Sequence, residues 1–145
     1  MTAKKIITCL MIAAGAVPPS QALAASPPRP WLGMGAIVRS EPQGGRFLYV
    51  AHAPSDTPAY RAGLRPGDLI TAIDGKKIGF RDDLDMMEFT SRLRIGSVLR
   101  LRVVRAGKSR ELQLRVGTLP PAYEQRWIDS LQRARDTRSR ARGTS

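Results

Sequence analysis

Residues 62–78 read Ala-Gly-Leu-Arg-Pro-Gly-Asp-Leu-Ile-Thr-Ala-Ile-Asp-Gly-Lys-Lys-Ile and form the most informative stretch of this 145-residue chain. Pro66 fixes φ, and Gly67 can adopt the positive φ that a type II turn needs. The apolar run 69–73 predicts a buried strand, and Asp74-Gly75 predicts the turn after it. The segment Pro66-Gly67-Asp68, like Gly63 and Gly75, sets the backbone conformation: it builds the fold and need not touch a ligand.

Short elements surround this stretch on both sides. Apolar residues at 99, 101 and 103 alternate with Arg100 and Arg102, and the same alternation returns over 110–116, which predicts a hairpin with its turn at Ala106-Gly107-Lys108. A short helix is expected just before the type II turn, capped by Ser55 or Asp56. The predicted elements are strands over 34–39, 47–51 and 69–73, helices over 55–62 and 82–93, and hairpin strands over 98–105 and 110–116.

The helix over 82–93 is apolar on two sides. At 100° per residue, one side carries Phe80, Leu84, Met87 and Ser91, and the opposite side carries Met86, Phe89 and Leu93. Either both stripes pack in the core, or one of them borders a groove. The acidic residues Asp82, Asp83 and Asp85 are interpreted as favourable charges at a helix start, not as a metal site.

The body of the chain, residues 31–117, resembles a PDZ domain of the bacterial exported type, as found in high-temperature-requirement and carboxy-terminal processing proteases. The resemblance rests on residues 62–78 and on Trp31-Leu32-Gly33-Met34, which stands where the family has its carboxylate-binding loop. Trp31 replaces the usual first glycine, and Gly35 is a second departure that weakens the following strand. The resemblance implies an α+β fold: a small, partly open β-barrel or sandwich of five to six strands with two helices, followed by a C-terminal helical tail.

The resemblance also implies a peptide-binding site. In the family, an extended peptide adds itself as a strand between the strand over 34–38 and the long helix. Backbone N–H groups of the loop around Gly33 would hold a terminal carboxylate without a charged side chain. The implied peptide-binding residues are Trp31, Leu32, Gly33, Met34, Ala36, Val38, Leu84, Met87 and Ser91.

Catalytic and metal-binding chemistry find no support in the sequence. The chain has one cysteine, Cys9, and one histidine, His52, so a Cys/His zinc cluster and an internal disulfide are excluded. His52 lies between two alanines at a predicted strand end, a surface position. We therefore expect a chain with no enzymatic activity, no catalytic residues, no metal and no cofactor.

The N-terminus has the pattern of a secretory signal over residues 1–25. Lys4 and Lys5 precede an apolar run over 6–17, and Ala22-Leu23-Ala24 supplies a small-x-small cleavage pattern. A proline-rich linker over 26–30 follows. The mature chain is expected in the periplasm or outside the cell.

The tail over 118–145 is basic, in a chain whose net charge is +12. Tyr123, Trp127, Leu131 and Ala134 recur at helical spacing, and the last ten residues are expected to be disordered. The tail either packs back on its own domain, or docks on a partner or on anionic lipid. Arginines without interleaved aromatics on an exported chain argue against nucleic acid.

Two functions remain open at this point. The first is an exported module that captures protein C-termini or exposed strands, acting as an adaptor or as a regulator of an envelope protein or of a separate protease. The alternative is a basic surface-attachment protein that binds anionic lipid or polysaccharide, with the PDZ-like fold as a scaffold.

Overall fold

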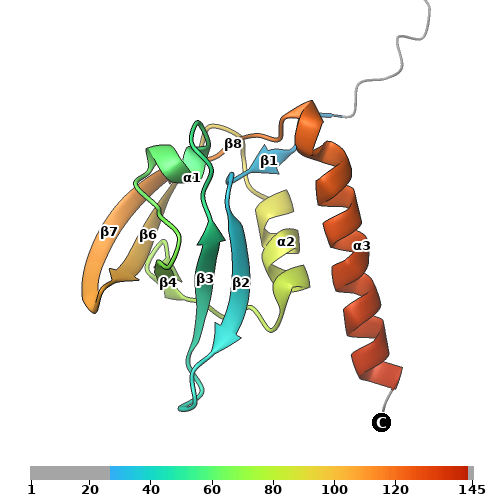
Figure 1. Ribbon diagram of the computed structural model, residues 1–145, viewed down its shortest axis with the longest axis horizontal. Coiled ribbons are helices and arrows are strands. Elements are labelled where there is room, and N and C mark those ends of the chain that lie inside the picture. The colour runs from blue at the N-terminus through green and yellow to red at the C-terminus, as the bar shows by residue number, and fades with distance from the viewer. Residues whose placement is uncertain (1–26, 144–145) are drawn as a thin grey trace, which may run out of the picture.

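The computed structural model describes residues 27–143, so the expected signal over 1–25 lies outside the described residues. Within residues 27–143, eight strands and three helices follow one another, and Figure 1 shows how they are arranged. They are β1 (Pro30–Trp31), β2 (Gly35–Ser40), β3 (Arg46–His52), α1 (Pro58–Arg61), β4 (Leu69–Ile73), β5 (Lys76–Lys77), α2 (Asp83–Ser91), β6 (Val98–Arg105), β7 (Lys108–Arg115), β8 (Gly117–Thr118) and α3 (Pro121–Gly143).

The strands form one large antiparallel sheet and one short pair. The six-stranded sheet has the order β2-β3-β4-β6-β7, with β5 paired to β4 off this path. The short pair joins β1 to β8, with Trp31 opposite Gly117. This confirms the predicted α+β fold of the PDZ type; the sheets do not close into a barrel.

The type II turn predicted around Gly67 is present. The Asp68 N–H donates to the Arg65 carbonyl oxygen at 3.2 Å, and Gly67 has φ +92°. Asp68 is buried, and both of its carboxylate oxygens accept from Arg105, at 2.8 and 2.6 Å. Arg105 comes from β6, so this ion pair fixes the turn to a strand far away in the sequence.

Two turn details differ from the sequence prediction. The N-cap of α1 is Thr57, not Ser55 or Asp56: its Oγ1 accepts from the Tyr60 N–H at 3.2 Å, and a proline follows at the first helical position. The β6–β7 turn holds only Ala106 and Gly107, at φ +51° and +76°, because Lys108 already pairs with Arg105. Two consecutive residues at positive φ match a two-residue hairpin turn.

The core lies between the inner face of the large sheet and the helices α1 and α2. Its fully buried side chains alternate along the strands, as the sequence pattern predicted, and include Leu48, Val50, Ile70, Leu101, Val103 and Leu114. From α2, Leu84 is buried, while Met86 and Phe89 pack partly against the core. The N-cap of α2 is Asp82, which accepts from the Asp85 N–H at 3.0 Å, as expected for acidic residues at a helix start.

The tail forms one helix, α3, which lies alongside α2 with α2 between it and β2 (Figure 1). The expected disorder of the last ten residues does not hold for residues 136–143, which are helical. Arginine is a good helix former, and Gln132 donates to Asp136 one turn later at 3.1 Å. Arg138 also contacts the folded domain, which holds the end of the helix in place.

Candidate functional site

The loop over residues 31–34 bends sharply between β1 and β2. The Leu32 carbonyl oxygen accepts from the Ala59 N–H at 2.9 Å, so the start of α1 holds the loop in position. Gly33 has φ +74°, and a Cβ there would meet the Pro58 ring at 2.8 Å. Both the backbone angle and the close approach therefore require glycine.

Three consecutive backbone N–H groups of this loop are free within the part of the chain that the structure describes. Among the hydrogen bonds of residues 27–143, none is donated by the N–H of Leu32, Gly33 or Met34. Successive free N–H groups in a turn with a positive φ can bind an anion. A terminal carboxylate would fit this arrangement without a neighbouring charged side chain.

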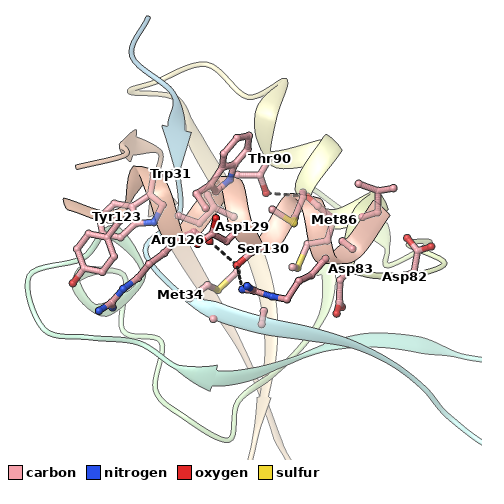
Figure 2. A pocket seen from close by; sticks show the side chains of 18 of the residues that line it. Trp31, Met34, Asp82, Asp83, Met86, Thr90, Tyr123, Arg126, Asp129 and Ser130 are labelled. Atoms are coloured by element: carbon pink, nitrogen blue, oxygen red, sulfur yellow. Dashed lines mark hydrogen bonds between the residues drawn. The ribbon is translucent and has the colours of Figure 1, made fainter. Parts of the chain in front are cut away.

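A pocket of about 1040 Å³ begins at this loop and runs between β2, α2 and α3. In Figure 2, Met34, Met86 and Ser130 point into it, and Trp31 and Tyr123 lie near one end. The predicted site residues that line it are Trp31, Leu32, Gly33, Met34, Ala36, Leu84 and Met87. The wall formed by methionines and aromatic rings is soft and apolar.

Two predicted site residues, Val38 and Ser91, do not line the pocket. Ser91 is exposed, and its hydroxyl donates back to the Glu88 carbonyl oxygen at 2.7 Å. The Val38 N–H faces α2 but donates to the Asp83 Oδ1 at 2.9 Å. Asp83 therefore occupies the edge of β2 at the end of the groove away from the loop.

The edge of β2 remains open nearer the loop. Ala36 lies opposite Val50. The Val50 N–H donates to the Asp68 carbonyl oxygen, and the Val50 carbonyl oxygen accepts from the Gly67 N–H, so both groups of Val50 face the β4 side of β3. Ala36 and Val50 therefore form a pair without mutual hydrogen bonds, and the backbone groups of Ala36 point away from β3, toward α2. One residue of β2 thus offers a donor and an acceptor to an added strand.

Several pocket residues were missed by sequence reasoning. Met86 and Thr90 belong to the same helix as the predicted residues, and His52 lies against Gly35 at the start of β2. Most of the others come from α3 and include Tyr123, Arg126, Trp127, Ser130 and Arg133. The helical spacing of Tyr123 and Trp127 was the available signal, but spacing alone does not say which face of the domain a tail helix meets.

A charged cluster lies where the end of α3 meets the start of α2. Arg138 donates to Asp82 at 2.8 Å and to Asp85 at 2.7 Å, and Arg81 donates to Asp85 at 2.9 Å. The hydrogen bond from Arg138 lowers the pKa of the Asp82 carboxyl. The hydrogen bonds from Arg81, joined by that from Arg138, hold the pKa of the Asp85 carboxyl well below its usual range.

The described residues give no sign of a metal centre or of a membrane span. Within residues 27–143, no group of three or more His, Cys, Asp or Glu side chains is placed to hold a metal ion. In the same part of the chain, no helix combines the length and the apolar character needed to cross a bilayer.

The fold and the loop define a PDZ domain, and the comparison with protein families agrees. Residues 30–116 match the family model for the PDZ domain, so the chain belongs to this family. Among curated proteins it is 35% identical over 86 residues to a probable periplasmic serine endoprotease DegP-like from Rhizobium meliloti, which covers 59% of this chain and 14% of that protein. It is 32% identical over 73 residues to the magnetosome formation protease MamE of Paramagnetospirillum magneticum, covering 50% of this chain and 10% of that protein. The chain thus spans only a small part of the length of these relatives.

Solved structures show the same likeness. The HtrA-type protease AlgW with decapeptide is 31% identical, with a TM-score of 0.54, over 65% of this chain and 30% of that chain. The HtrA3 PDZ domain bound to a phage-derived ligand (FGRWV) is 18% identical, with a TM-score of 0.52, over 63% of this chain and 88% of that chain, which shows the fold alone.

Proposed function

We propose that this chain is a non-catalytic peptide-binding module that captures protein C-termini by adding them as a strand between β2 and α2. The observation that carries the proposal is the set of free N–H groups on Leu32, Gly33 and Met34, at the head of an apolar pocket. A carboxylate on those groups would place the last side chain of the peptide against Met34 and Met87.

The open edge of β2 sets how far the added strand pairs. The backbone groups of Ala36 are available, whereas the next outward N–H, on Val38, is bonded to Asp83. Main-chain pairing therefore covers the last few residues of a ligand, and a longer ligand pairs further only if Asp83 releases Val38.

The setting of the proposed activity is the cell envelope. The curated relatives include several described as periplasmic endoproteases, and the first residues of this chain have the pattern of an export signal. Because the match is to the PDZ domain and the chain has a single histidine, we assign it capture without cleavage, as an adaptor that presents a bound C-terminus to another envelope protein.

The proposal is tested by placing a charge inside the pocket. Met87→Lys should weaken binding of a free-carboxylate decapeptide ending in an apolar residue by about tenfold or more, because an ammonium group would be desolvated beside the bound side chain. Ser91→Lys is the matched control, since Ser91 lies on the same helix, is exposed and is outside the pocket. Titration calorimetry with both variants gives the comparison. Equal affinity for the two would show that the groove is not the site.

A further inference from the structure

Ring contacts and ion pairs join helix α3 to the domain near both of its ends. Near its start, the Tyr123 ring packs against the Trp31 ring with 5.4 Å between the ring centroids. The guanidinium carbon of Arg29 lies 4.7 Å from the centroid of the Trp127 ring. Arg29 also pairs with Glu124 at 3.9 Å. These contacts place the first turns of α3 beside the loop that carries the free N–H groups.

Near the other end, Arg138 joins α3 to the start of α2. Its guanidinium donates to carboxylate oxygens of both Asp82 and Asp85, and its side chain is only 17% exposed. Asp82 is also the N-cap of α2, so the ion pair is built on a fixed helix end. The raised pKa of Arg138, caused mainly by the hydrogen bond to Asp82, agrees with a well-formed pair.

α3 does not fill the domain's core, because none of its residues is buried. Its half-buried positions form a single stripe along the helix: Glu124, Trp127, Ser130, Leu131, Ala134 and Arg138. A helix of 23 residues is about 34 Å long. This length spans the groove from the loop to the start of α2 and leaves the pocket of about 1040 Å³ open beneath it.

We propose that α3 is the third wall of the peptide site, with Trp127 as a contact for the bound peptide and Arg138 as the positioning residue that holds the wall. The inference rests on the proposed function, because the occupant is the C-terminal segment held by the loop at 31–34. Trp127 lines the pocket and is half-buried, so a ligand's apolar side chain would cover its remaining surface.

If α3 is a wall of the site, it should slow the dissociation of a bound ligand. A ligand enclosed by β2, α2 and α3 leaves more slowly than one held by β2 and α2 alone, because its release requires contacts with α3 to break. A helix that merely competed for the groove would do the opposite, and loosening it would tighten ligand binding. The sign of the effect therefore separates a wall from a competitor.

The first experiment measures association and dissociation rates of a free-carboxylate decapeptide ending in valine with the full chain. Trp127→Ala should weaken binding by about three- to tenfold, and Arg138→Ala by about threefold through faster dissociation, with partial recovery in Arg138→Lys. The controls are Ile128→Ala, an exposed apolar residue of α3 outside the pocket, and Arg135→Ala, an exposed arginine of the same helix. Both controls should bind as the parent chain does.

The second experiment uses intrinsic fluorescence, since Trp31 and Trp127 are the chain's two tryptophans. Trp31→Phe leaves Trp127 as the reporter, and its emission should shift when the decapeptide is added. Tighter binding by Trp127→Ala and Arg138→Ala would show that α3 competes with the ligand for the groove. Unchanged binding, with no shift in Trp127 emission, would show that α3 takes no part in binding. Either result would contradict the proposal that α3 is a wall of the site. If the parent chain binds no free-carboxylate peptide at all, the proposed function fails first, and that result is distinguishable from the other two.

Discussion

Gly67 and Asp68 are neighbours in the chain but stabilise the same turn by different means. Gly67 supplies a backbone conformation at φ +92°, and a Cβ there would meet no atom within 4 Å. Asp68 supplies buried hydrogen bonds, accepting from the Arg65 N–H at 2.9 Å and from Arg105 in β6. The turn therefore depends on one conformational and one electrostatic term, which can be separated by experiment.

Gly67→Val tests the conformational term. A β-branched residue in the left-handed region is strained even where space is open, so we expect the free energy of unfolding to fall by about 1–3 kcal/mol. Gly79→Val is the control, because Gly79 has open space around it and no positive φ. Urea unfolding of both variants checks this, and similar stabilities would contradict the role given to Gly67.

Acid titration tests the electrostatic term. Burial raises the pKa of Asp68, but the hydrogen bonds from Arg105 and from the Arg65 N–H outweigh it, and the pKa lies below its ordinary value. A lowered folded-state pKa stabilises the protein above the unfolded-state pKa of about 3.9, and this stability is lost as the pH falls through the folded-state value. The difference in unfolding free energy between the parent and Asp68→Asn should therefore shrink below about pH 4. Parallel pH curves for the two proteins would argue against this assignment.

At the scale of elements, the start of α2 occupies part of the edge of β2 to which a ligand strand would pair. The Asp83 carboxylate accepts from the Val38 N–H, so the helix closes the strand edge just beyond Ala36. The bond joins an exposed side chain to the strand that would receive a ligand. Asp83 thus acts on the length of strand pairing and not on the pocket for the last residue.

Asp83→Ala should free the Val38 N–H for a ligand. We expect a free-carboxylate hexapeptide to bind about two- to tenfold more tightly, the value of one added backbone hydrogen bond, while a tripeptide that ends before this point is unaffected. Glu88→Ala removes the same charge from an exposed position of α2 and serves as the control. Fluorescence anisotropy with labelled peptides gives both affinities, and an equal gain for tripeptide and hexapeptide would point to a general charge effect instead.

The strand β4 and the helix α2 show what the sequence could and could not predict. The strand β4 was predicted with its bounds, because a short apolar run between a Pro-Gly-Asp turn and an Asp-Gly turn leaves little freedom. For α2, periodicity predicted two apolar sides, but Met86 from one side and Met87 from the other line the same pocket. Periodicity predicts the direction in which a helical residue faces, whereas a groove between elements is lined by residues that face neighbouring directions.

At the scale of the whole molecule, the site is assembled from segments that are far apart in the chain. The pairing of β1 with β8 brings residue 31 next to residue 117, so the loop and the beginning of α3 become neighbours. No local pattern contains this contact, which explains why the sequence indicated residues 31–34 as candidates but gave no sign that Trp127 lines the same pocket. Arg138 lies 56 positions from Asp82, and only the folded chain shows that they pair.

The most direct test of carboxylate capture compares one peptide in two chemical forms. A decapeptide ending in an apolar residue is titrated calorimetrically against the full chain, once with a free C-terminus and once with an amidated one. If the N–H groups of Leu32, Gly33 and Met34 receive the carboxylate, amidation should reduce the binding free energy by about 1.5–3 kcal/mol, the range for a hydrogen bond to a charged group. Measurable binding with equal affinity for the two forms would contradict capture of a terminal carboxylate by this loop.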